Sequence, residues 1–362
     1  MGSFVHLHNH TEYSLLDGLA RTRELTARAA ELGMPAVAVT DHGTMYSTIQ
    51  FYRHARAAGV KPIIGVEMYI APRRMTDRDS DKDRKPYHLV LLAENQAGYL
   101  NLLKIASEAQ LTGFYYRPRV DKPFLSEHAE GIIALSGCGS GEIPQLLHEG
   151  RLEEARRAAN WYREVFGPHN FFIELQDHEI PELRAINPKL IGLARELDIP
   201  LVLTNDAHYV RREDAAAHDI LLCIQTNSTV NQTNRMRMSD DGYYLKSAEE
   251  MARLFPDLPE AMQNTLHIAE RCQVHLDDEG YHLPHFDVPE NCGDAQCYLR
   301  SLVEEGIRRR YPQATEPITR RMEHELRVIH DMGFDTYFLI VWDLCQASRK
   351  RDIWWNVRGS GA

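Results

Sequence analysis

The sequence predicts an α/β protein in which a distorted (β/α)7 barrel is followed by a small, mainly helical segment. Seven short apolar runs recur between residues 4 and 209, and amphipathic stretches with a helical period lie between most of them. No G-x-G-x-x-G motif follows the first run. This disfavours the alternative, an open doubly wound sheet that binds a dinucleotide.

The strands are predicted from the apolar runs themselves, which are too short for helices and rich in β-branched residues. Such continuous runs are typical of strands buried on both faces of a parallel sheet. The predicted strands span residues 4–7, 36–39, 62–66, 89–92, 131–135, 171–175 and 200–203.

Helices are predicted from apolar positions spaced three and four residues apart. Within the barrel they span residues 22–32, 48–58, 96–110, 152–166 and 187–197, and beyond it 215–223, 248–255 and 259–272. Residues 281–289 contain two prolines and read as an extended linker, which places a domain boundary near residue 285. Three further helices, over 295–311, 318–332 and 337–350, predict a second domain of residues 286–362.

Composition limits the class of protein. The 362 residues are 43% apolar and 26% charged, which is typical of a globular protein and excludes disorder. The net charge of -11 disfavours a non-specific duplex binder, so contact with nucleic acid must be local. The apolar runs are shorter than the roughly 20 residues of a membrane helix, and Met1 is not followed by a signal peptide. A cytoplasmic protein with free thiols is expected.

One segment, residues 76–85, consists mostly of charged side chains without helical periodicity. This composition predicts a solvated loop. The alternative is a loop beside a cleft that contacts a polyanion. Arginine clusters at 308–310 and 320–321 have two similar interpretations. They form solvated helix faces, or they contact a DNA backbone.

Side chains that bind metals gather where the predicted strands end. Alternation along an extended chain places His8 with His10, and Asp206 with His208, on one face each. So many ligand groups at one rim would repel one another without cations, which predicts a multinuclear metal site. The candidate ligands are His8, His10, Asp17, His42, Glu67, His88, Cys138, Asp206 and His208.

The ligand types narrow the metal and the chemistry. Five imidazoles, three carboxylates and one thiol suit Zn²⁺ or Mn²⁺, with Fe²⁺ possible, and nine ligands imply two or three ions. Clustered divalent ions chiefly hydrolyse phosphate esters. These residues therefore predict a metal-dependent phosphoesterase and leave the ester open.

The same residues carry a resemblance. Residues 6–11 (HLHNHT), 40–43 (TDHG), 65–67 (GVE) and 205–208 (NDAH) resemble the motifs of the polymerase and histidinol phosphatase (PHP) superfamily. The segments GFYYRPR at 113–119, LLCIQT at 221–226, HLPHF at 282–286 and MGFDTYFLIVWD at 332–343 resemble the bacterial replicative DNA polymerase III alpha family, over essentially the whole chain.

The resemblance implies a 3′→5′ exonuclease that proofreads the primer terminus with a three-metal cluster, in which Asp206, His10 and Glu67 are catalytic. It assigns His8, His10, Glu67 and Asp206 to the first ion. Glu67 bridges to the second ion, which His88 and Cys138 also bind, and Asp17, His42 and His208 bind the third. The expected partners are the primer 3′ end and, through a full-length protein, a sliding clamp or a separate exonuclease subunit.

The resemblance also identifies residues 286–362 as the start of the polymerase palm, and residues 357–362 as similar to a loop that grips nucleotide phosphate. The catalytic aspartates of the polymerase are expected downstream, so no polymerisation is expected from these residues. Two alternatives remain. One is a small-molecule phosphatase of the histidinol-phosphate type, and the other is a metal-stabilised, non-catalytic scaffold that docks a separate proofreading subunit.

Overall fold

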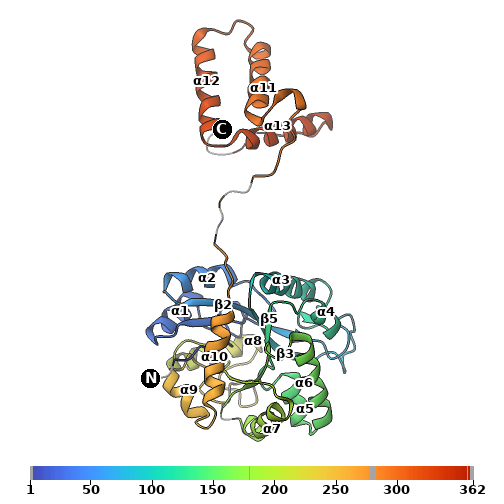
Figure 1. Ribbon diagram of the computed structural model, residues 1–362, viewed down its shortest axis with the longest axis vertical. Coiled ribbons are helices and arrows are strands. Elements are labelled where there is room, and N and C mark those ends of the chain that lie inside the picture. Colours follow the sequence, from blue (N-terminus) through green and yellow to red (C-terminus); the bar gives the residue numbers. More distant parts are fainter. Residues whose placement is uncertain (1–2, 179, 278–279, 281–282, 357, 359–362) are drawn as a thin grey trace. The chain divides into compact units, whose positions relative to one another are not determined.

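A mixed β-sheet lies at the centre of the N-terminal part of the chain in the computed structural model (Figure 1). The structure describes residues 3–178, 180–277, 280, 283–356 and 358. The chain divides into two units, Met1–Leu276 and Asp277–Ala362. The boundary predicted near residue 285 lies inside the second unit.

The strand order is β1-β2-β3-β5-β6-β7, and β4 pairs with β2. The strands are β1 (Ala36–Val39), β2 (Lys61–Ile70), β3 (Tyr87–Ala93), β4 (Arg119–Val120), β5 (Ile132–Leu135), β6 (Phe171–Leu175) and β7 (Leu201–Leu203). The prediction of a wholly parallel sheet is wrong for β3, which is antiparallel to both β2 and β5. A parallel neighbour needs a crossover, usually a helix, whereas the segment between β2 and β3 contains no helix.

The predicted first strand, residues 4–7, does not form a regular strand. Residues 4–10, which include this buried run, instead lie between β1 and the chain after β7, and their backbone hydrogen-bonds to both. Ala38 donates to the His6 carbonyl over 2.9 Å, and His10 donates to the Ala207 carbonyl over 2.7 Å. The segment therefore joins the two edges of the sheet, which with it forms a distorted barrel.

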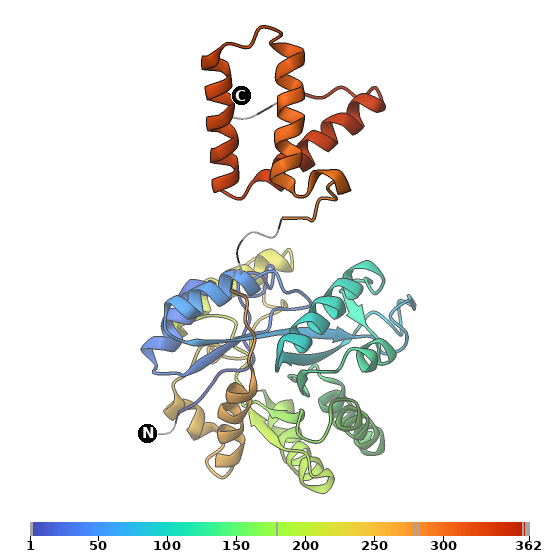
Figure 2. The same ribbon diagram turned by 45° about the horizontal axis from the view of Figure 1, so that its top comes forward.

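The helices predicted around the sheet are confirmed to within a few residues, except that α7 begins six residues early, at Pro181. Figure 2 shows them around the outside of the sheet. They are α1 (Thr22–Glu31), α2 (Thr48–Ala57), α3 (Gln96–Leu111), α6 (Leu152–Phe166), α7 (Pro181–Leu197), α8 (Ala215–Gln225), α9 (Ala248–Leu254) and α10 (Pro259–Arg271). Two short helices, α4 (Lys122–Glu127) and α5 (Glu142–His148), were not predicted.

The charged segment over residues 76–85 is a loop whose side chains are mostly exposed, as predicted, but Asp83 is buried. Its carboxylate accepts from Arg73 over 2.9 Å and from the Asp79 amide over 2.8 Å. The guanidinium of Arg119, also buried, donates to backbone carbonyls of the loop at Asp77 and Asp83, over 2.9 and 2.8 Å. The loop is therefore anchored to the barrel.

The second unit consists of α11 (Ala295–Arg310), α12 (Glu316–Asp331) and α13 (Asp335–Lys350), with a short 3₁₀ helix at Glu290–Cys292. Leu299, Leu326 and Leu339, one from each α-helix, form its small buried core. Most of the loop predicted over residues 357–362 lies outside the described residues. Among the helices that the structure describes, none has the length and apolar character to cross a membrane.

Acid should destabilise the barrel through His6. Its ring is buried and hydrogen-bonds to the Lys246 carbonyl over 2.9 Å, and burial lowers the pKa of His6 to about 4. The unfolded chain protonates this ring near pH 6.5, so stability is lost as the pH falls from there toward 4. We expect the wild type to lose about 2 kcal/mol more than His6→Gln between pH 7 and pH 5. Denaturant unfolding in chelator measures this difference, and equal losses would contradict it.

Candidate metal centre

All nine predicted ligands lie together at one end of the barrel. His8, His10 and Asp17 follow the N-terminal segment, Glu67 lies in β2, and the others lie in or just after β1, β3, β5 and β7. Because β3 is antiparallel, its beginning lies at the same end of the sheet as the end of β2. Tyr69 pairs with His88, which places His88 diagonally beside Glu67.

The first group is His8, His10, Glu67 and Asp206. The Nε2 atoms of His8 and His10 lie 3.2 and 3.1 Å from one Asp206 carboxylate oxygen. The same two nitrogens lie 3.3 and 3.4 Å from the two oxygens of Glu67. The ligand atoms of His8, His10 and Asp206 all lie within 4.8 Å of one another, a spacing that one ion could span.

The second group is Glu67, His88 and Cys138. The Nδ1 atom of His88 lies 2.9 Å from Glu67 Oε1. The Cys138 sulfur lies 3.7 Å from that oxygen and 3.7 Å from the same nitrogen. Glu67 therefore contributes to two groups, the position expected of a bridging carboxylate.

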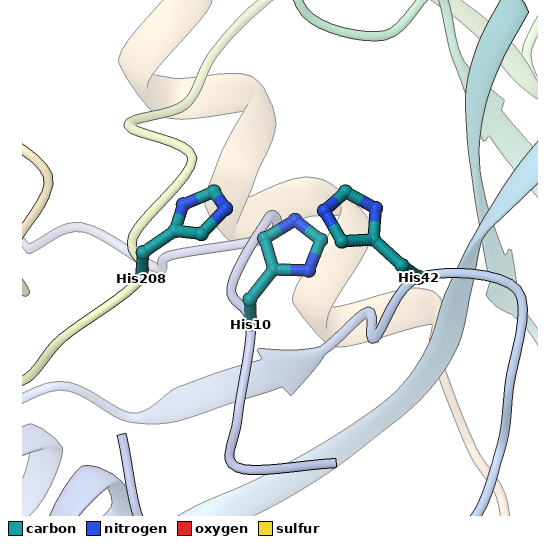
Figure 3. A group of neighbouring side chains, drawn as sticks. All are labelled: His10, His42 and His208. Carbon is teal, nitrogen blue, oxygen red and sulfur yellow. The ribbon is translucent and has the colours of Figure 1, made fainter. Parts of the chain in front are cut away.

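The third group is Asp17, His42 and His208. Asp17 lies 2.9 Å from His42 Nε2 and 3.9 Å from His208 Nε2. Figure 3 shows the ring of His10 between the rings of His42 and His208, with centroid distances of 4.0 and 4.4 Å. His10 therefore lies close enough to serve the third group as well as the first, which the sequence did not predict.

The protonation states of Glu67 and His10 favour the binding of cations. Burial, with His42 and His208 nearby, lowers the pKa of His10 to about 3, so this ring is neutral and able to act as a ligand. Burial opposes a charge on Glu67, but the imidazoles of His88, His42 and His8 outweigh it and hold the pKa of Glu67 well below its usual range. Burial raises the pKa of the Cys138 thiol, which would become a ligand only beside a cation.

Buried polar atoms in the cluster lack hydrogen bonds. Among the described residues, one oxygen each of Asp17, Glu67 and Asp206 and the Nδ1 atom of His42 are buried and make no hydrogen bond of suitable geometry, although His42 Nδ1 lies 2.6 Å from Glu67 Oε2 and the Asp206 oxygen faces His8 and His10. Leaving such atoms unsatisfied costs about 1–3 kcal/mol each. Divalent cations would satisfy them, so these side chains fit the predicted metals.

Two residues that were not predicted as ligands hold the cluster in place. Asp41 accepts from the Thr11 amide over 2.6 Å and from the Ser47 hydroxyl over 2.5 Å, and so ties the loop after His10 to the end of β1. The second residue is Asn205, which supports the backbone of the ligand Asp206. Asp206 has a φ of 47°, an uncommon value for a residue with a side chain. Its neighbour Asn205 donates to the carbonyls of Gly242 and Tyr244, both over 2.8 Å, and so fixes the turn.

Sequence reasoning also missed Glu174, a carboxylate within the apolar run of β6. Its Oε1 lies 2.7 Å from His8 Nδ1 and accepts from the Thr204 hydroxyl over 2.5 Å. The other oxygen accepts from the Gly137 amide over 3.0 Å. The Nδ1 contact turns Nε2 of His8 toward the cluster, which is the usual arrangement around a ligating histidine. The signal in the sequence that could have identified Glu174 was a charged residue within an otherwise apolar predicted strand.

Glu174→Gln should weaken metal binding without removing a ligand. The amide keeps the size of the side chain but loses the charge that orients His8 and makes it more basic, so affinity for Mn²⁺ or Zn²⁺ should fall about 10–100-fold. Calorimetric titration measures this, with Glu164→Gln, an exposed residue of α6, as the control. Equal affinities in both variants would show that Glu174 does not orient the ligand.

A cavity of about 450 Å³ opens onto the cluster. Asp17, His42, His88, Cys138, Asp206 and His208 line it together with His178 and Tyr243. The buried His178 ring stacks on Tyr243 at 3.8 Å. The cavity gives a small phosphate group access to several of the candidate ligands at once.

The chain matches two known sequence families. Residues 6–178 match the family described as the PHP domain, and residues 297–362 match the bacterial DNA polymerase III alpha NTPase domain. The chain is 46% identical to the DNA polymerase III subunit alpha of Treponema pallidum, over 99% of this chain and 31% of that protein. It is 39% identical to the Thermus aquaticus subunit, over 98% of this chain and 34% of that protein.

Among solved structures, the chain is similar to an amidohydrolase from Chromobacterium violaceum, at 15% identity and a TM-score of 0.36. The similarity covers 57% of this chain and 88% of that protein. The fold, the histidine motifs and the family match together define a PHP domain. The chain as a whole belongs to the bacterial DNA polymerase III alpha subunit family. It spans about a third of the length of these relatives.

Proposed function

We propose that residues 1–285 are a metal-dependent phosphodiesterase that removes nucleotides from the 3′ end of a primer during DNA replication, and that residues 286–362 begin the polymerase palm. The observation that carries the proposal is the shared use of Glu67 and His10. Each lies between ligand groups, so the nine side chains form one continuous cluster rather than separate sites.

The proposed metals are two or three divalent ions, Zn²⁺ or Mn²⁺, with Fe²⁺ as a further candidate. When bound, such ions lower the pKa of water and neutralise charge on a phosphate. The residues of the chain would fix their spacing: Glu67 and Asp206 with their buried negative charge, and His10 as a neutral ring. These three are therefore the proposed catalytic residues. The other proposed ligands are His8, Asp17, His42, His88, Cys138 and His208.

The proposed partner is the primer 3′ end. Contacts with a sliding clamp or a separate exonuclease subunit would belong to the full-length protein. The basic clusters at 308–310 and 320–321 are exposed on α11 and α12, where a DNA backbone could reach them.

Digestion of a labelled primer-template in Mn²⁺ or Zn²⁺ tests the proposal, with p-nitrophenyl phosphate hydrolysis measured beside it. Stepwise shortening from the 3′ end supports the exonuclease. Ester hydrolysis without DNA degradation would instead indicate the small-molecule phosphatase. Metal binding without either activity would indicate the scaffold.

A further inference from the structure

A second cavity, of about 670 Å³, adjoins the metal centre. Asp17, His42 and His88 form part of its wall and also line the first cavity, so the two are continuous at the cluster. Basic and aromatic side chains form one side of its wall, and Pro86, Ser140, Gln145, Gln225 and Met236 complete the lining. We call it the basic groove; its defining side chains are Tyr69, Arg84, Lys85, Tyr116 and Arg117.

The three cations of the groove are free to bind an anion. Arg84, Lys85 and Arg117 are exposed, and within the described part of the chain no carboxylate lies at ion-pair distance from any of them. Arg73, which lies just before the charged loop, is by contrast paired with Asp83 over 2.5 Å. In a chain of net charge -11, three such cations in one cavity beside the candidate metal centre favour the binding of phosphates.

Aromatic rings alternate with these cations. The Arg84 guanidinium lies 5.3 Å from the ring centre of Tyr116, which is 56% exposed. Arg117 lies 5.8 Å from the ring centre of Tyr69. The Tyr69 ring in turn contacts two candidate ligands, at centroid distances of 5.8 Å to His42 and 5.0 Å to His88. Side chains in contact thus lead from the groove to the cluster.

The groove is held in shape by one buried side chain. Arg119 donates to the Asp83 carbonyl, next to Arg84, and to the Gly113 carbonyl over 3.2 Å, before Tyr116 and Arg117. Both loops that supply the groove are therefore anchored to the same guanidinium. A preformed site of this kind loses little conformational entropy on binding.

We propose that the basic groove binds one strand of nucleic acid and leads its 3′ end to the metal centre. The inference rests on the proposed function, because it names the path of the substrate to that site. Cations interleaved with exposed aromatic rings suit a single strand, whose phosphates pair with the cations while its bases stack on the rings. A duplex keeps its bases stacked on one another and would leave Tyr116 unused.

Binding of a fluorescein-labelled 12-mer of deoxythymidine, followed by fluorescence anisotropy in chelator, tests the proposal without turnover. The triple variant Arg84→Gln, Lys85→Gln and Arg117→Gln should bind at least about tenfold more weakly, and the slope of log K against log salt should fall by about 2, since three phosphate contacts are lost. The control, Arg53→Gln, Arg157→Gln and Arg195→Gln, removes three exposed cations elsewhere and should bind as the wild type does.

Tyr116→Ala should weaken binding roughly tenfold, and Tyr116→Phe, which keeps the ring, should restore it. Unchanged melting temperatures would show that each variant folds.

Equal binding and equal salt slopes in the two triple variants would overturn the proposal, as would tighter binding of a duplex 12-mer. Strand binding in the groove without nuclease activity would refute the proposed function alone. Nuclease activity with a groove that does not bind would refute this inference alone.

Discussion

Asp206→Ala is expected to reduce metal-dependent 3′ nuclease activity by at least about a thousandfold. One Asp206 oxygen lies 3.2 Å or less from the Nε2 atoms of both His8 and His10, so its loss removes a charge that both rings face. Metal ions supply several kcal/mol of transition-state stabilisation, and each 1.4 kcal/mol corresponds to tenfold in rate. Stepwise digestion of a 3′-labelled primer measures the loss, and His10→Ala should show a similar one.

Two further variants separate chemistry from folding. Asp206→Asn keeps a side chain that tolerates the positive φ at this position but has no charge, so it should fold and still lack activity. Asp257→Ala removes an exposed carboxylate on the surface and should retain wild-type activity. Full activity in Asp206→Asn or in His10→Ala would refute the assignment of these ligands.

Chelation of divalent ions should lower the melting temperature of the chain by about 5–15 °C. Ligands held at 100–1,000 times their Kd stabilise a fold by about 3–4 kcal/mol, and each kcal/mol corresponds to about 2–4 °C in a domain of this size. The physical reason is the set of buried oxygens and the nitrogen that lack hydrogen-bond partners within the cluster. Calorimetry with and without chelator, followed by readdition of Mn²⁺ or Zn²⁺, measures the effect.

The same experiment on Asp206→Asn provides the control. With a ligand missing, the variant should begin with a lower melting temperature in metal and lose less of it on chelation. A wild-type melting temperature that does not change on chelation would show that the cluster contributes nothing to folding, and would count against metal binding at this site.

Much of the site could be predicted because its pattern is local. His8 with His10, and Asp206 with His208, lie two residues apart in extended segments, and alternation alone places each pair on one face. The apolar runs likewise predict six of the seven strands, since a strand buried on both faces must be apolar throughout. The N-terminal run was predicted as a strand for the same reason, but it forms only a few of the backbone bonds that define one.

Tertiary structure decided the rest. The direction of β3 depends on how the chain returns from β2, and the run from Leu89 to Leu92 would look the same in either direction. Glu174 and Arg119 are charged residues whose burial depends on partners far along the chain, such as His8 and the carbonyls of the charged loop. The sequence by itself thus identified the nine candidate ligands. Only the packing of distant segments decided that Glu67 and His10 lie between the ligand groups and that a basic groove leads to them, because those positions depend on contacts that no local pattern encodes.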